Sequence, residues 1–132
     1  MSTTTDAAVS QVANVIIPIA DQDAAVAFYT EKLGLELRAD VPFGNGDRWI
    51  EVAPNESAQT PIALCPPGPN GTTGNLSTGI CLQTDDVDSY HAQLKERGVD
   101  VDDEVSRMGE PVPPMFWFRD HEGNSLMVVE VN

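Results

Sequence analysis

Positive charge is scarce in this sequence. Of its 132 residues, seven are Lys or Arg and 21 are Asp or Glu, which gives a formal net charge of −14 at pH 7. Binding to nucleic acid needs a basic surface that neutralises phosphates, and anionic membranes require the same. We therefore expect neither partner. A negative field attracts a cationic ligand, although solubility alone also accounts for such a charge.

The sequence also lacks export and membrane signals. No apolar run approaches the ~20 residues that span a bilayer. The opening MSTTTDAAVSQ has neither a basic start nor an apolar stretch, so it is unlike a signal peptide, and we expect residues 1–11 to form a flexible tail. There are only two cysteines, Cys65 and Cys81, which without a secretion signal predict free thiols in a cytoplasmic protein.

What the sequence does contain is a repeat. Residues 19–37, IADQDAAVAFYTEKLGLEL, align with residues 83–101, QTDDVDSYHAQLKERGVDV. Each copy has an apolar strand, an aspartate that can cap a helix, the helix itself and a glycine that ends it (Gly34 and Gly98). A second strand then begins, so the two halves of the chain share one plan.

Apolar periodicity extends each copy to a β-α-β-β-β module. The expected strands are 12–19, 35–39, 48–53 and 60–65 in the first half, and 77–83, 99–105, 115–119 and 125–131 in the second. The second helix begins at Asp85 or Asp86. We predict an α+β fold in one structural unit, with a first module at 12–65, a Pro/Gly linker at 66–75, a second module at 76–132 and both helices on one side of curved sheets.

This order of elements resembles the vicinal-oxygen-chelate superfamily, which includes glyoxalase I, extradiol dioxygenases and the fosfomycin and bleomycin resistance proteins. The resemblance lies in DQDAAVAFYTEKLGL, DVDSYHAQLKERGV and FWFRDHEGNSLMVVE, and FRDHEGN falls where the family has F-x-D-P-D-G-N, with His121 in place of the usual proline. It covers the chain from about Val12 to Glu130. It implies that each module forms half of a cup-shaped mixed sheet around a ligand, and that two chains pair as a homodimer.

The resemblance also implies four inward-facing positions where metal-bearing members usually carry His, Glu or Gln. Counted from the aspartate that opens each helix, these positions are Asn14, Ala63, Gly79 and Met127. Asn14 offers one neutral oxygen, and the other three offer nothing to a hard divalent ion. Because a catalytic metal generally needs three protein ligands, we expect no metal and no other cofactor.

Two tryptophans are the strongest candidates for ligand binding. In the fosfomycin-resistance relatives, the residue matching Trp49 in GDRW and the residue three before the turn aspartate, here Trp117, line the pocket. Large rings suit a flat or cationic ligand, although core packing is an equal alternative. Glu51 shares a strand face with Trp49. It can pair with a cation or act as a base if it faces the cup, and is otherwise a solvated strand-edge charge.

The cysteines and one methionine complete the expected lining of the cup. Cys65 and Cys81 each lie two residues beyond an expected ligand position, so strand alternation puts them on the same face. They can act as reactive thiols or a soft-metal pair, or serve as small buried hydrophobic residues, which is the commoner role of free cysteine. Met115 precedes Trp117 by two residues on the same expected strand.

Neither histidine has the placed partner that a general base needs. His91 lies mid-helix, away from the cup, and is expected to be a partly buried packing residue. His121 is expected to be solvent-exposed at the tip of its turn. The sequence therefore identifies no catalytic residue.

Three functions remain open at this stage. The first is a metal-free small-molecule binding protein, similar to the bleomycin-resistance members, that sequesters an amphipathic or cationic compound. The second is a lyase, isomerase or dioxygenase with an atypical site, and the third is a fold used only for protein association. We favour the first because of the empty ligand positions, the two tryptophans and the charge of −14, and leave open whether the protein is an enzyme.

Overall fold

The computed structural model describes residues 7–44 and 46–131, which contain two four-stranded sheets. The first sheet has the order β1-β4-β3-β2, formed by β1 (Val15–Pro18), β2 (Glu36–Pro42), β3 (Arg48–Ala53) and β4 (Ile62–Cys65). The second has the order β5-β8-β7-β6, formed by β5 (Ser77–Thr84), β6 (Asp100–Val101), β7 (Met115–Arg119) and β8 (Ser125–Glu130). In each sheet one pair of neighbouring strands is parallel, β1 with β4 and β5 with β8. The other pairs are antiparallel. The predicted α+β fold of two tandem modules is confirmed.

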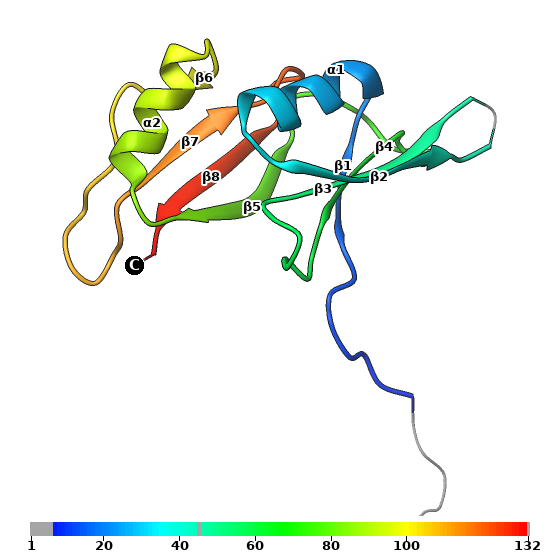
Figure 1. Ribbon diagram of the computed structural model, residues 1–132, viewed down its shortest axis with the longest axis horizontal. Coiled ribbons are helices and arrows are strands. Elements are labelled where there is room, and N and C mark those ends of the chain that lie inside the picture. The colour runs from blue at the N-terminus through cyan, green and yellow to red at the C-terminus, as the bar shows by residue number, and fades with distance from the viewer. Residues whose placement is uncertain (1–6, 45, 132) are drawn as a thin grey trace, which may run out of the picture.

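Each module has one helical segment, and both lie on the same side of the sheets (Figure 1). Helix α1 (Gln22–Ala27) continues into a π-helical segment, η1 (Phe28–Lys32), and α2 spans Val87–Glu96. Asp21 caps the first helix by accepting the Ala24 N–H, and Asp86 caps the second by accepting the Ser89 N–H. Asp86, rather than Asp85, is therefore the cap. No helix among the described residues is long and apolar enough to cross a membrane.

The two modules share one hydrophobic core beneath these helices. Phe28 of η1 stacks on Phe118 of β7 with ring centroids 6.4 Å apart, which joins the first module to the second. The core includes Ile50 and Leu64 from the first sheet and Leu126 from the second. Because side chains alternate along a strand, the strand residues between these core positions face away from the helices and are free to line a site.

The turn after β7 fixes the start of the first helix. Asp120, only 6% exposed, accepts the Tyr29 hydroxyl at 2.7 Å and backbone N–H groups of its own turn. Glu122 accepts the backbone N–H of Ala20 at 3.0 Å and that of Asp21 at 2.9 Å. These bonds connect residues about 100 positions apart, so the sequence D-H-E-G-N of the second module orients the first.

One sequence expectation for the second module was wrong in detail. The strand expected at 99–105 is reduced to the two residues of β6, because the Asp102 side chain accepts the Trp117 N–H and takes the place of a backbone partner. His121 is exposed as a residue, as expected, although its side chain alone is 18% exposed and its imidazole packs against Phe28 with ring centroids 5.9 Å apart. Residues 66–75 contain no helix or strand.

Candidate functional site

A row of four residues crosses the first sheet on the face away from the core. It consists of neighbours on successive strands: Ile16, Ala63, Glu51 and Ala39. Ile50, the next residue along β3, is fully buried in the core, so Glu51 points to the opposite face. Two of the four side chains are alanines, and of these Ala63 is fully buried.

Trp49 and Glu51 form a hydrogen-bonded pair on this face. The indole Nε1–H donates to Glu51 Oε2 at 2.9 Å, and both residues are half-buried. The exposed Phe43 meets the Trp49 ring edge-on, with ring centroids 5.9 Å apart and planes at 74°. Glu51 is therefore hydrogen-bonded to the tryptophan. The alternative prediction, a solvated charge at the strand edge, did not include this contact.

A glutamine that sequence reasoning missed holds the strand of this pair in place. Strands β3 and β4 pair only at Glu51–Ala63 and Val52–Ile62, and then diverge. The Gln22 carboxamide fills the gap, since its Nε2 donates to the carbonyls of Arg48 at 2.6 Å and Leu64 at 2.9 Å. Its Oε1 accepts the Arg48 N–H at 3.1 Å. A glutamine at a helix start has no sequence signal that would reveal this contact.

The corresponding row on the second sheet is formed by Cys81, Met127 and Trp117. Together with Gly79 these residues line a cavity of about 220 Å³, and Trp117 is 39% exposed. The two rows match by register, so Trp117 occupies the position that Glu51 has in the first module. Met115 lies two residues before Trp117 on β7, opposite Val129. It therefore corresponds to Trp49, which lies two residues before Glu51.

The four expected ligand positions are not cross-strand partners of one another. Ala63 lies opposite Ile16, and Met127 lies opposite Cys81. Asn14 and Gly79 each come two residues before these cross-strand partners. Asn14 is half-buried and precedes β1. Gly79 sits at a register shift with a φ of +73°, a backbone conformation that favours glycine. No three His, Cys, Asp or Glu side chains gather to hold a metal among residues 7–44 and 46–131.

The two cysteines belong to different sheets and differ in exposure. Cys65 ends β4, is 4% exposed, and has its thiol pKa raised by burial, as expected of a small buried hydrophobic residue. Cys81 is exposed on β5, so for this residue the expectation of burial was wrong. Cys81, unlike Cys65, lines the cavity beside Trp117.

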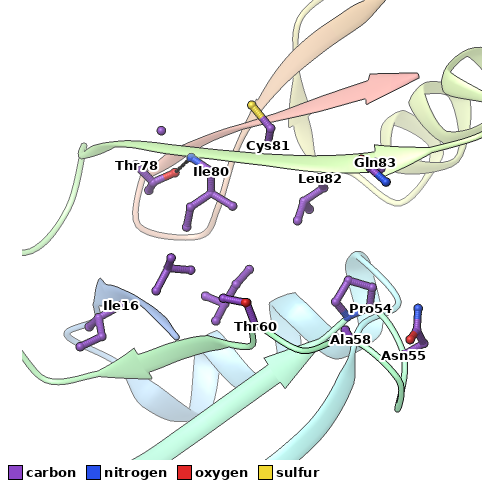
Figure 2. A pocket seen from close by; sticks show the side chains of 13 residues that line it. Ile16, Pro54, Asn55, Ala58, Thr60, Thr78, Ile80, Cys81, Leu82 and Gln83 are labelled. Carbon is purple, nitrogen blue, oxygen red and sulfur yellow. Dashed lines mark hydrogen bonds between the residues drawn. The ribbon is translucent and has the colours of Figure 1, made fainter. Parts of the chain in front are cut away.

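A larger cleft of about 630 Å³ opens between the two modules, beside the edge strands β1 and β5. Figure 2 shows Ile80 and Leu82 of β5 pointing into the cleft toward Thr60, whereas Cys81 lies on the opposite side of the strand. Gly79 and Cys81 contribute to its lining, but neither tryptophan does. Hence neither this cleft nor the smaller cavity brings Trp49 and Trp117 together.

The arginines near the two tryptophans are already bound by carboxylates. Arg48 pairs with Asp23 and Asp40, and its hydrogen bond lowers the pKa of Asp40. Arg119 forms hydrogen bonds of 2.9 Å with Asp100 and with Asp102, and in the same way lowers the pKa of Asp100. Both regions therefore keep a net negative charge.

His91 serves as a packing residue, as predicted. Its ring lies 4.9 Å from that of Phe116, centroid to centroid, and its Nε2 lies 2.7 Å from the Asp102 carbonyl oxygen. It contributes to neither row of residues on the sheet faces.

Comparisons with known proteins agree with this architecture. A family model described as Glyoxalase/Bleomycin resistance protein/Dioxygenase superfamily matches residues 11–128. The chain is similar to TnmS3, an antibiotic binding protein from Streptomyces sp. CB03234, with 37% identity, a TM-score of 0.81 and coverage of 96% of this chain and 100% of TnmS3.

Two further relatives cover most of the chain. A superfamily member from Sphaerobacter thermophilus DSM 20745 has 33% identity and a TM-score of 0.84, over 93% of this chain and 98% of its own. The uncharacterized protein YurT of Bacillus subtilis (strain 168) is 34% identical over 120 residues, which are 85% of this chain and 92% of YurT.

Proposed function

We propose that this chain, which belongs to the Glyoxalase/Bleomycin resistance protein/Dioxygenase superfamily, binds a small amphipathic or cationic organic compound and sequesters it without a metal. The observation that carries the proposal is the pair of matched rows on the two sheets. One row presents Glu51 beside Trp49, and the other presents Trp117 beside Met127. Aromatic and apolar side chains with a few placed polar groups are typical of small-molecule sites.

The chemistry of the ligand positions supports binding without a metal. Ala63 and Gly79 have no donor atom in their side chains, Met127 has only a soft thioether, and Asn14 has a neutral amide oxygen. Hard divalent ions in catalytic sites are held by carboxylate or imidazole groups. Elemental analysis of protein purified without chelators tests this part of the proposal. One equivalent of nickel, zinc, iron or manganese would contradict it.

A relative of known binding activity supports the same conclusion. TnmS3, which this chain matches over nearly its whole length, is described as an antibiotic binding protein. The net charge of −14 suits a ligand that bears positive charge. The half-buried Trp49 and the exposed Trp117 suit a flat one.

We further propose that the protein is a homodimer in which two copies complete the binding sites. Strands β1 and β5 are the outer strands of their sheets, and Ile16 on β1 is 54% exposed. No charged residue occurs in 7–20 or 57–84, the segments that contain both strands. Copies that each carry −14 can approach there without burying an unpaired charge.

Sedimentation tests the homodimer directly. We expect a mass near twice the 14.2 kDa of one chain at micromolar concentration. Replacement of Ile16 by Lys on the exposed edge should shift the mass toward one chain, whereas the same change at Val9, which is 93% exposed in the extended N-terminal segment, should not. A mass of one chain for the unaltered protein would contradict the proposal.

Fluorescence titration tests ligand binding. Basic glycopeptides and planar heteroaromatic cations are added while tryptophan emission is followed, and at least one should give saturable quenching. Trp49→Ala should weaken that binding about tenfold, because stacking on an aromatic side chain contributes roughly 1–3 kcal/mol. The proposal fails if the whole panel leaves the emission unchanged and Trp49→Ala behaves like the unaltered protein.

A further inference from the structure

The two carboxylate oxygens of Glu51 have different surroundings. Oε2 accepts the indole N–H of Trp49 at 2.9 Å, whereas Oε1 accepts no hydrogen bond from residues 7–44 or 46–131. In the same residues, no buried side-chain oxygen lacks a partner, so Oε1 reaches solvent. One oxygen therefore holds the ring, and the other is free to accept a hydrogen bond from a ligand.

The charge of Glu51 is also not balanced by a cation of the described chain. Its neighbours across the sheet are Ala39 and Ala63, which are small and uncharged. Arg48, the basic residue nearest along β3, is bound by two aspartates, and no ion pair between described residues includes Glu51. A half-buried carboxylate without a counter-charge favours a ligand that supplies one.

The second sheet offers no such charge at the matching place. Trp117 occupies the register position of Glu51, and the residues that line its cavity are all uncharged. Arg119 is bound by Asp100 and Asp102. The rows on the two sheets, each one half of the proposed site, thus differ in chemistry. The first has a carboxylate beside its indole, and the second has sulfur atoms beside its indole.

We infer that Glu51 is a specificity-determining residue that orients the Trp49 ring through Oε2 and selects, through Oε1, ligands in which a planar ring carries a cationic N–H donor. This inference rests on the proposed function. It assigns the ligand class as protonated amino-heteroarenes, with the amino group at Glu51 and the ring against the Trp49 indole. A hydrogen bond between two charged groups is about twice as strong as a neutral one, which makes the selection effective.

Three variants separate the two roles of Glu51. Glu51→Gln keeps an oxygen that can accept the indole N–H but removes the charge, and Glu51→Ala removes both. Glu56→Gln removes one negative charge from an exposed residue outside the strands and serves as the matched control. Because Glu51→Gln preserves the shape of the side chain, the charge comparison stands even if Glu51→Ala fails to fold.

Isothermal titration with two ligands of the same ring system tests selection by charge. At pH 8, 9-aminoacridine is a cation with N–H donors, and acridine is neutral. The unaltered protein and Glu56→Gln should bind 9-aminoacridine about tenfold more tightly than acridine, and Glu51→Gln should bind the two alike. A preference that persists in Glu51→Gln overturns the inference alone. Binding of neither ligand to the unaltered protein also overturns the inference, and it overturns the proposed function only if the whole fluorescence panel fails to bind as well.

The orienting role has a readout that needs no ligand. In a Trp117→Phe background, Trp49 is the only tryptophan, since the chain has two. Glu51→Ala should shift its emission to the red and increase quenching by acrylamide, because the indole N–H then bonds to water, while Glu51→Gln should leave both unchanged. Identical emission in all three proteins would show that Glu51 does not hold the ring.

Discussion

At the scale of single residues, burial separates the side chains that stabilise the fold from those that can bind. Trp117 and Phe118 are consecutive on β7 but point to opposite faces. Phe118 is fully buried in the shared core, whereas Trp117 is 39% exposed and lines the cavity of about 220 Å³ on the second sheet. The same alternation separates Ile50 from Trp49 and Glu51 on β3.

We therefore expect opposite consequences when these two neighbours are replaced by alanine. Phe118→Ala should lower the free energy of unfolding by about 3–5 kcal/mol, as is usual for a buried aromatic ring. Trp117→Ala should cost less than about 1 kcal/mol but weaken ligand binding about tenfold. Urea denaturation and titration of both variants check this, and a Trp117→Ala variant as unstable as Phe118→Ala would contradict it.

At the scale of elements, a few side chains position whole strands and helices. The Gln22 carboxamide bridges β3 and β4 where their backbones diverge, and it contacts the residue that precedes Trp49. Next to Gln22 along the chain, the first helical segment is connected to the turn after β7 by Asp120 and Glu122. Both contacts link the helix start to the strands that carry the proposed site.

Loss of the Gln22 bridge should disturb binding as well as stability. Gln22→Ala leaves the Arg48 N–H and two carbonyl groups without their side-chain partner, so we expect a loss of about 1–3 kcal/mol in the free energy of unfolding. The emission of Trp49 in a Trp117→Phe background should change as well. Gln93→Ala, on an exposed position of α2, is the matched control and should change neither quantity.

The tyrosines make the fold sensitive to alkali. Burial, together with the nearby Asp120, raises the pKa of Tyr29, and burial raises the pKa of Tyr90 to about 12. Both pKa values exceed the ordinary value of about 10 for an unfolded chain. This contribution to stability is therefore fully present below pH 10 and is lost as the pH rises toward the folded values, because the unfolded chain releases these protons first.

Absorbance of tyrosinate measures this effect. The chain has only two tyrosines, so at pH 11 the folded protein should show little tyrosinate, and the signal should then appear together with unfolding. Tyr29→Phe should make the alkaline loss of stability smaller. Tyrosinate that forms near pH 10 without loss of structure would contradict the expectation.

At the scale of the whole molecule, the duplicated modules were predictable, and the contacts between them were not. Strands 48–53 and 115–119 were predicted with the bounds of β3 and β7, because each short, mostly apolar segment lies between clear turn signals. The short β6, the shifted register at Gly79 and the packing of the His121 ring against Phe28 depend on contacts with distant residues. Local periodicity carries no information on such contacts.

The same distinction applies to the site. The face shared by Trp49 and Glu51 followed from strand alternation alone, and their hydrogen bond bears it out. The equivalence of Glu51 with Trp117 required the register of both sheets, which differs from a count along the sequence because of the shift in β5. The central claim of the proposed function is that the two rows, from one copy of the chain or from two, surround one ligand.

Nuclear magnetic resonance of the two indole N–H groups tests that claim most directly. The chain has two tryptophans and so gives two indole signals, one from each proposed half-site. When 9-aminoacridine is added, we expect both signals to shift and to saturate with the same dissociation constant, because one ligand contacts both rings. Two different constants, or a shift confined to one signal, would contradict a single site lined by Trp49 and Trp117.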